Sequence, residues 1–243
     1  LFTLSLATAI FSSFYIGYMM CIFCFIYFFY AYFCVTEREI GKKQKAWQEE
    51  MTCLQQRVDD RMEVAMPNFQ LGFKCPPIGT GTQSIRQEII GDLAAEALFG
   101  ESSGLYLKLY EEGVIDSSFG GGFETVDGAA MLLCSGDSES PEVIRQAILA
   151  QAQTLRAEGI GEDAFLRMKR SALGRRIRAL DSFDSTCFRL CAYHLEDYDY
   201  FDFPALFEEV TIDEVRQYIA DNVRLEKSSL SIVDPRGKLK IES

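Results

Sequence analysis

The stretch Glu101–Glu124, ESSGLYLKLYEEGVIDSSFGGGFE, decides how the rest of the chain is arranged. One of its adjacent serines can accept hydrogen bonds from the free N–H groups of a short helix, and Gly113 suits the left-handed residue that ends one. After Gly113 the side chains alternate, with Ile115, Phe119 and Phe123 on one side, as a strand requires. The stretch therefore predicts a short helix that leads directly into a strand.

Regular patterns on both sides of this corner predict the other elements. Upstream, residues 69–74 alternate like a strand that two prolines end, and residues 85–98 have apolar side chains at helical spacing. Downstream, Asp127-Gly128 is typical of a hairpin turn, and residues 129–134 have the length of a buried strand. Further helices are expected over 141–159, 162–180, 185–195 and 211–219, with a last strand at 229–233. This order predicts an α+β fold, with a mainly antiparallel sheet and its helices packed on one face.

The opening of the chain differs from the rest. Residues 1–35 carry no charged side chain and exceed the ~20 apolar residues that cross a bilayer. The basic residues that follow predict a membrane anchor with the acidic remainder on the cytoplasmic side. Because the chain begins with Leu1 rather than Met, the alternative is a cytoplasmic protein fragment whose apolar edge is an artefact. Helical spacing then predicts a charged amphipathic linker helix over 36–63, which leaves 64–240 as the α+β domain.

Composition excludes several function classes. A formal net charge of −12 argues against nucleic-acid binding. The eight cysteines show no disulfide framework, and we expect free thiols in a reducing compartment. A zinc-peptidase helix of the H-x-x-E-H type needs two histidines, whereas His194 is the single histidine of the chain. We therefore expect no catalytic residue, no metal site and no cofactor in this chain.

Three weaker patterns have simpler interpretations. Cys187, Cys191 and His194 fall on one helical face and would suit zinc, but they lie on one element, so packing is favoured over a metal or redox protein. The glycines at 120–122 lack the surroundings of a phosphate-binding loop, and we expect them to allow close approach of another segment. The basic cluster at 167–178 is typical of a solvated helix face paired to nearby acids.

The corner also carries a resemblance. The pattern S-x-L-Y-x-x-L-Y-E-E-G-x-I-x-x-x-F at 103–119 resembles the C-terminal half of M16 (insulinase and pitrilysin) metallopeptidases. The segments LGFK, GIGEDAFLRMKRSALG, TIDEVRQYI and SLSIVDP resemble that half at the expected places in the chain. The match covers about residues 60–236 and is most similar to bacterial processing-protease-like members.

The resemblance implies a fold and a role. Such proteins have two related α+β halves that enclose a peptide, and the N-terminal half carries the zinc. Where active members supply a substrate-binding Arg and Tyr from the C-terminal half, this chain has Tyr110 and Asp116. We therefore expect a non-catalytic, peptide-clamping half, inactive alone, with Tyr110, Asp116, Phe119 and Phe123 lining the chamber. Its expected partners are a peptide and a zinc-bearing N-terminal half, or a paired homologous subunit, outside this chain. The alternative is a membrane-tethered interaction domain without peptidase activity, with the helix at 162–180 or the linker helix as its contact surface.

Overall fold

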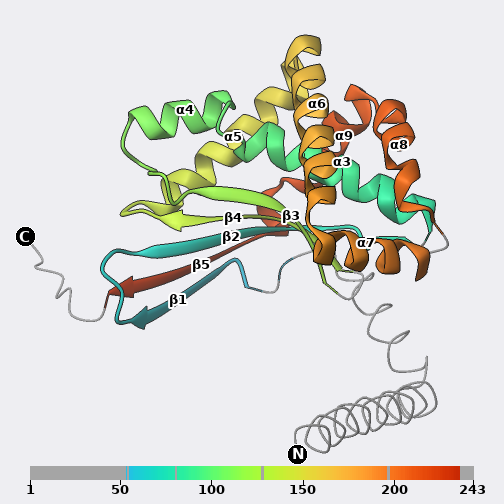
Figure 1. Cartoon of the computed structure of the whole chain (residues 1–243). Helices are drawn as coiled ribbons and strands as arrows, with labels where there is room; N and C mark the ends of the chain where they lie inside the picture. The colour runs from blue at the N-terminus through green and yellow to red at the C-terminus, as the bar shows by residue number, and fades with distance from the viewer. Residues whose placement is uncertain (1–52, 54, 80, 127–128, 196–197, 236–243) are drawn as a thin grey trace, which may run out of the picture. The chain divides into compact units, whose positions relative to one another are not determined.

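The computed structural model describes residues 53, 55–79, 81–126, 129–195 and 198–235 (Figure 1). All of them belong to one compact unit, Glu50–Ser243. The apolar segment 1–35, residues 36–52 of the expected linker helix and the expected hairpin residues Asp127-Gly128 lie outside the described residues. Among the described helices, none is both long enough and apolar enough to cross a bilayer.

The described strands form one five-stranded sheet in the order β1-β5-β2-β4-β3. They are β1 (Arg57–Met62), β2 (Asn68–Cys75), β3 (Gly120–Val126), β4 (Ala129–Asp137) and β5 (Ser228–Pro235). The three pairings that join β5 to β2, β2 to β4 and β4 to β3 are antiparallel, whereas β1 is parallel to β5. The sheet is therefore mixed, and the expectation of a mainly antiparallel sheet is wrong because it did not include β1.

Strand β1 occupies the end of the expected linker helix. Val58 and Met62 are four residues apart, which fits a helix, but all six side chains of β1 are exposed. Its backbone pairs with β5, from Arg57 opposite Leu230 to Met62 opposite Pro235. The strand is therefore held by main-chain hydrogen bonds rather than by a buried face. Because helix prediction relies on the pattern of buried side chains, this strand was missed.

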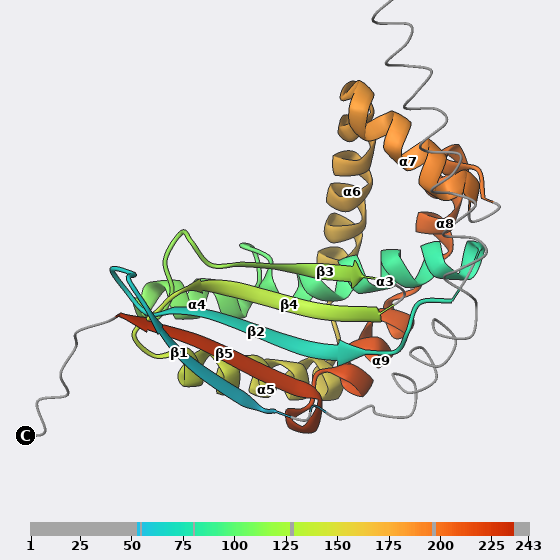
Figure 2. The ribbon, with the colours of Figure 1, turned by 90° about the horizontal axis from the view of Figure 1, so that it is seen from below.

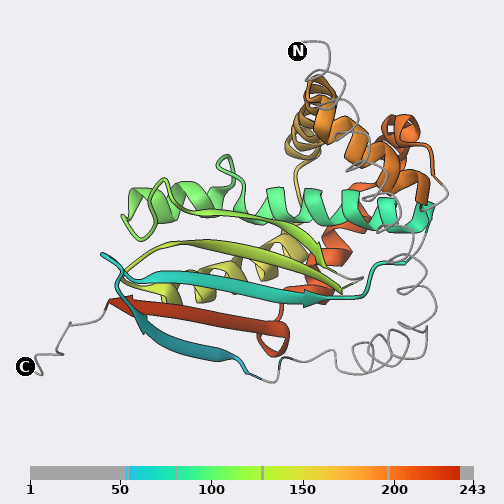
Figure 3. The same cartoon turned by 60° about the horizontal axis from the view of Figure 1, so that its bottom comes forward.

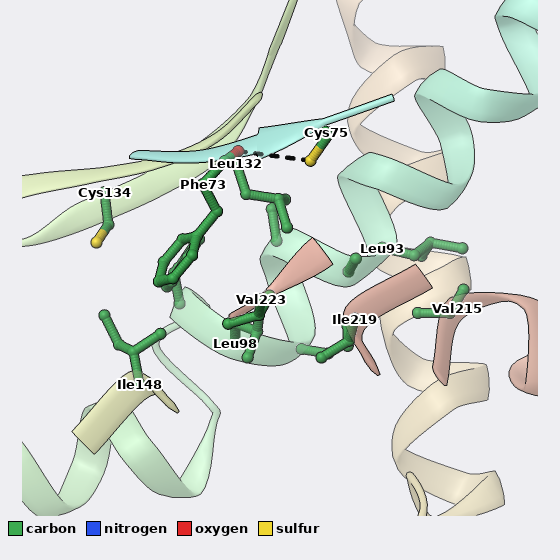
Figure 4. Packing of buried hydrophobic residues seen from close by; sticks show 14 of the residues in the cluster. Phe73, Cys75, Leu93, Leu98, Leu132, Cys134, Ile148, Val215, Ile219 and Val223 are labelled. Carbon is green, nitrogen blue, oxygen red and sulfur yellow. Dashed lines mark hydrogen bonds between the residues drawn. The ribbon is translucent and has the colours of Figure 1, made fainter. Parts of the chain in front are cut away.

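One face of the sheet carries the hydrophobic core. Alternate residues of β2, from Phe69 to Cys75, are buried beneath α3 (Thr82–Phe99), α5 (Pro141–Glu158) and α9 (Ile212–Asn222). Figure 4 shows side chains of these three helices meeting those of β2 and β4. On the opposite face, Gln70 and its β4 neighbour Ser135 are exposed. In Figures 2 and 3 the helices that touch the sheet lie on the core side, as expected.

A second group of helices extends beyond the edge strand β3 (Figure 2). It consists of α6 (Glu162–Arg178), η1 (Ala179–Asp181), α7 (Phe183–Leu195), η2 (Tyr200–Asp202) and α8 (Phe203–Glu209). Its interior is aromatic: the ring of Tyr200 lies 5.0 Å from the ring of Tyr193 and 5.0 Å from that of Phe203. This group and α3 form the side of the molecule that faces β3.

The helix at the corner forms as expected. Helix α4 (Gly104–Glu111) begins where Ser103 Oγ accepts the backbone N–H of Tyr106 at 3.1 Å. After the helix, Gly113 adopts a φ of 68°, a left-handed conformation that glycine adopts at little cost. The prediction of a serine cap and a glycine stop is therefore confirmed.

The strand, however, does not follow directly. Residues 114–119 form turns, in which the Asp116 carboxylate accepts the backbone N–H of Ser118 at 2.7 Å. Short Asp and Ser side chains favour such turns by bonding to nearby backbone. Ile115 and Phe119 are still buried, but from a loop, and the strand begins only at Gly120. Local turn chemistry therefore outweighs the alternating pattern.

Candidate functional site

A groove of about 410 Å³ lies beside the edge strand β3, and we call it the β3 groove. Residues 121–125 of β3 form one wall, and α3 forms the floor with Glu88, Asp92 and Glu96. The opposite wall consists of the last turns of α6 and Arg189 of α7. Figures 1 and 2 show how these elements meet where β3 approaches the middle of α3. The groove thus joins an edge strand to a concentration of ionisable side chains.

Glycines bring β3 and α3 close together. A Cβ on Gly91 of α3 would lie 2.5 Å from the ring of Phe123, and a Cβ on Gly121 would lie 2.5 Å from the ring of Phe99. The side chain of Phe123 also meets Tyr218 of α9 edge to face, with ring centres 6.3 Å apart. The expectation that the glycines at 120–122 allow close approach is therefore confirmed at Gly121.

The floor of the groove contains a buried cation. The side chain of Arg176 is 10% exposed, and its Nη2 lies 3.0 Å from Asp92 Oδ2 and 3.7 Å from Glu88 Oε2. Its Nη1 donates to Tyr193 Oη at 2.9 Å, and that hydroxyl donates to Glu88 at 2.9 Å. Burial raises the pKa of Tyr193 to about 12, so its hydroxyl keeps the proton that it donates. The result is a closed network in which each carboxylate faces the guanidinium.

The other two arginines of the groove differ in their partners. Arg175 Nη2 lies 2.9 Å from Glu96 Oε2, and its Nη1 donates to Ser171 Oγ at 3.1 Å. Arg189 makes no hydrogen bond or ion pair with any residue that the structure describes. Arg189 is therefore the groove cation whose charge stays available to a ligand.

The groove does not provide a zinc site. Glu88 and Asp92 are four residues apart on α3, a spacing that places two ligands on one face, but Arg176 already supplies the positive charge there. Within the described ranges, no group of three His, Cys, Asp or Glu residues is arranged to hold a metal. The residues present therefore do not fit zinc.

The cysteines also disagree with part of the sequence interpretation. Cys187, Cys191 and His194 are exposed on α7, and the neighbouring Phe188 is 75% exposed, so this face is not core packing. The described cysteines are free thiols, and Cys75 and Cys134 are buried. The exposed face of α7 is therefore an apolar surface.

The four residues predicted to line a chamber lie in two places. Tyr110 is exposed and stacks on Tyr106 at 5.8 Å, and Tyr106 lies 6.0 Å from the buried Phe119. Asp116 is exposed in the adjacent turn, where hydrogen bonds from Ser118 hold its pKa below the ordinary value. Phe123 lies apart from them, half-buried in the β3 groove. Their contact with a substrate stays a prediction.

Sequence reasoning missed the central residue of the groove. Arg176 was assigned to a solvated basic face, yet it is buried together with Phe165 and Ala172 of α6. Leu166 and Ile177, which the helical pattern placed inward, are 46% and 51% exposed. The available signal was Asp92, a charge on α3 between the buried Ile89 and Leu93, because a buried charge requires a partner elsewhere in the fold.

The fold and this groove can now be compared with known proteins. The sequence profile described as the peptidase M16 inactive domain matches residues 35–172, more than half of the chain. The chain belongs to the M16 peptidase family. The predicted similarity to the C-terminal half of that family is thereby confirmed.

Individual relatives agree with this assignment. The M16 chain is 26% identical over 197 residues to YmfH of Bacillus subtilis, named as an uncharacterized zinc protease, and the match covers 80% of this chain and 46% of YmfH. A protein of Alicyclobacillus acidocaldarius assigned as an M16-like peptidase has the same fold, with a TM-score of 0.71 and 24% identity over 76% of this chain and 45% of that one. This M16 chain thus spans less than half the length of either relative.

An isolated inactive domain also has this fold. The structure assigned as the inactive peptidase domain of a Bordetella parapertussis zinc protease superposes with a TM-score of 0.59 at 14% identity. The superposition covers 74% of this chain and 98% of that one. A unit of this size therefore exists in a solved structure without a second half in the same chain.

Proposed function

We propose that this chain is the non-catalytic, peptide-clamping C-terminal half of an M16 zinc peptidase. It acts together with a zinc-bearing N-terminal half or a paired homologous subunit. The match to an inactive domain supports the absence of catalysis, and the coverage of 46% of YmfH supports the assignment to one half. The catalytic zinc belongs to the partner half, where it would activate water for peptide cleavage.

One observation carries the proposal. The carboxylates of Glu88 and Asp92, which face the groove from α3, are neutralised by the guanidinium of Arg176. A guanidinium offers only N–H donors, so it can neither bind a metal nor activate water in its place. The geometry therefore supports holding a ligand rather than cleaving one.

The first test uses the purified chain alone. We expect no hydrolysis of a quenched fluorescent peptide mixture and less than stoichiometric zinc by mass spectrometry of the metal content. Peptide hydrolysis by the chain with one bound zinc per molecule would show the proposal to be wrong.

The second test supplies a catalytic half. The part of YmfH that lies outside the matched segment is expressed as a separate chain and mixed with this protein. Peptide hydrolysis should increase when this chain is added, because a clamping half encloses the substrate. Addition of an equal amount of serum albumin serves as the control. An unchanged rate would contradict the clamping role.

A second candidate function, an interaction domain, rests on the exposed apolar face of α7. Phe183, Phe188 and Leu195 are 80%, 75% and 85% exposed. Exposed apolar patches of this kind are typical of interaction surfaces. The membrane tether through 1–35 and the cytoplasmic location remain separate proposals. Carbonate extraction separates them, since an anchored protein stays in the membrane pellet and a cytoplasmic one does not.

A further inference from the structure

The outer edge of β3 is open. This strand is the last in the described sheet, and it pairs only with β4. Soluble proteins usually protect such edges with lysines, prolines or bulges, because unpaired backbone groups recruit another strand. β3 has none of these: it begins with three glycines, and Glu124 is its one charged residue. The edge therefore has the features of a site for strand addition.

The β3 groove offers space along that edge. Its volume of about 410 Å³ falls within the range of ~300–1,000 Å³ that ligand sites occupy. Helix α3 lies beneath it, held close to β3 by the contact of Phe123 with Gly91. Backbone added along β3 would lie between the strand and the arginines of α6 and α7. An extended chain is the shape that satisfies both walls at once.

The charges of the groove favour one kind of side chain. Arg176 is bonded to Asp92 and Glu88, and Arg175 is bonded to Glu96, so these acids and cations are already paired. Arg189 has no such partner within the described residues. A guanidinium binds a carboxylate with two parallel hydrogen bonds, which makes it selective for acidic groups.

We propose that the β3 groove binds an extended peptide segment by strand addition to β3, with a carboxylate of that segment paired to Arg189. The ligand class is thus an acidic peptide in extended conformation, not a nucleic acid or a small anion. This inference rests on the proposed function, since it specifies how the non-catalytic half holds a peptide. It also adds a chemical preference that the fold alone does not imply.

The test measures binding by the purified chain without any partner. The probe is a fluorescein-labelled decapeptide of alternating Ser and Val with one central Glu, followed by fluorescence anisotropy. A second peptide has Gln in place of Glu. We expect the Glu peptide to bind at least about tenfold more tightly, because a charge-assisted pair is lost in the Gln peptide. Equal affinity of the two peptides, or no binding of either, would overturn the proposal.

Two variants locate the carboxylate. In Arg189→Gln the preference for the Glu peptide should disappear, whereas the weaker binding of the Gln peptide should persist. Arg167→Gln is the matched control, because Arg167 is an exposed arginine of α6 outside the groove. It should change the affinity for the Glu peptide by less than about twofold, as surface charges at a distance are screened. A similar loss in both variants would indicate unspecific attraction and reject the site.

Backbone methylation tests strand addition. Two versions of the Glu peptide carry N-methyl groups on alternate residues, in the two registers that block opposite edges of an extended chain. Because only one edge of the peptide pairs with β3, one version should bind and the other should not. Equal binding of both would exclude strand addition. Reduced hydrogen exchange at residues 120–126 in the complex should accompany the binding of the permitted version.

The outcomes separate this inference from the proposed function. If YmfH-dependent hydrolysis is stimulated but neither Arg189→Gln nor methylation matters, the clamp stands and the β3 site is wrong. If the peptide binds as described but hydrolysis is not stimulated, the site stands and the clamping role is wrong.

Discussion

Arg176 Nη2 lies 3.0 Å from Asp92 Oδ2, and this ion pair joins α6 to α3 beneath the β3 groove. The two partners are not equally buried, since the arginine side chain is 10% exposed and the aspartate side chain 40%. The cost of removing each partner should therefore differ.

Asp92→Ala should lower the free energy of unfolding by about 2–3 kcal/mol, because it leaves the buried guanidinium with the more distant Glu88 as its remaining acid. Arg176→Met should cost about 1 kcal/mol, since Asp92 and Glu88 can then be hydrated at the groove surface. Urea unfolding with unchanged m-values measures both. Equal losses, or a larger loss for Arg176→Met, would contradict the network as described.

Gly91 provides a test of the contact between α3 and β3. Alanine normally favours a helix by about 1 kcal/mol over glycine, but Gly91→Ala would place a Cβ 2.5 Å from the Phe123 ring. Overpacking of this kind costs about 1–3 kcal/mol, so the variant should be less stable than the wild type.

Gly174→Ala is the matched control for that variant. Gly174 lies within α6, and an added Cβ there would meet nothing within 4 Å. This substitution should stabilise the protein by about 0.5–1 kcal/mol in the same urea experiment. Combining Gly91→Ala with Phe123→Ala should cost less than the sum of the two single changes. Additive losses would show that the two residues do not touch.

Glu214 predicts how stability responds to acid. Although its partial burial acts in the opposite direction, hydrogen bonds from Thr211 and Arg86 hold the pKa of Glu214 below its ordinary value of 4.5. A carboxyl group with a lowered pKa in the folded state stabilises that state above the ordinary value. This contribution is lost as the pH falls below 4.5 and through the lowered pKa.

The variant that tests this is Glu214→Gln, which keeps a capping side chain but removes its charge. Its deficit in unfolding free energy should be greatest above pH 4.5 and shrink as the pH falls below that value. Urea unfolding between pH 7 and pH 3 measures the difference. A deficit that does not change with pH would show that the charge of Glu214 is not involved.

The features that sequence predicted correctly are those set by neighbours along the chain. Thr211 and Glu214 form the expected capping box, because the two groups that meet are three residues apart. Strand β1 was missed, since its stability comes from the backbone of β5, which lies more than 150 residues away in the chain. The strand after α4 was placed too early because the bond from Ser118 to Asp116 competes with the alternating pattern.

The candidate site was harder to predict for the same reason. Phe123 was singled out from its place in the alternating pattern, and it does line the β3 groove. Arg176 was assigned to the solvent, because a run of basic residues does not show which one meets an acid on another helix. Only the packing of α6 against α3 reveals that Asp92 and Arg176 are partners.

The last prediction concerns the exposed face of α7. Phe188→Glu replaces a side chain that is 75% exposed, so it should change the free energy of unfolding by less than about 0.5 kcal/mol. Phe207→Ala is the buried comparison: that side chain is 2% exposed, and its loss should cost about 3–5 kcal/mol. Phe188→Glu should also raise the concentration at which the protein precipitates, because it interrupts an apolar patch. Static light scattering at increasing protein concentration, with urea unfolding in parallel, measures both effects. If Phe188→Glu destabilised the fold as strongly as Phe207→Ala, the α7 face would be part of the core rather than a free surface.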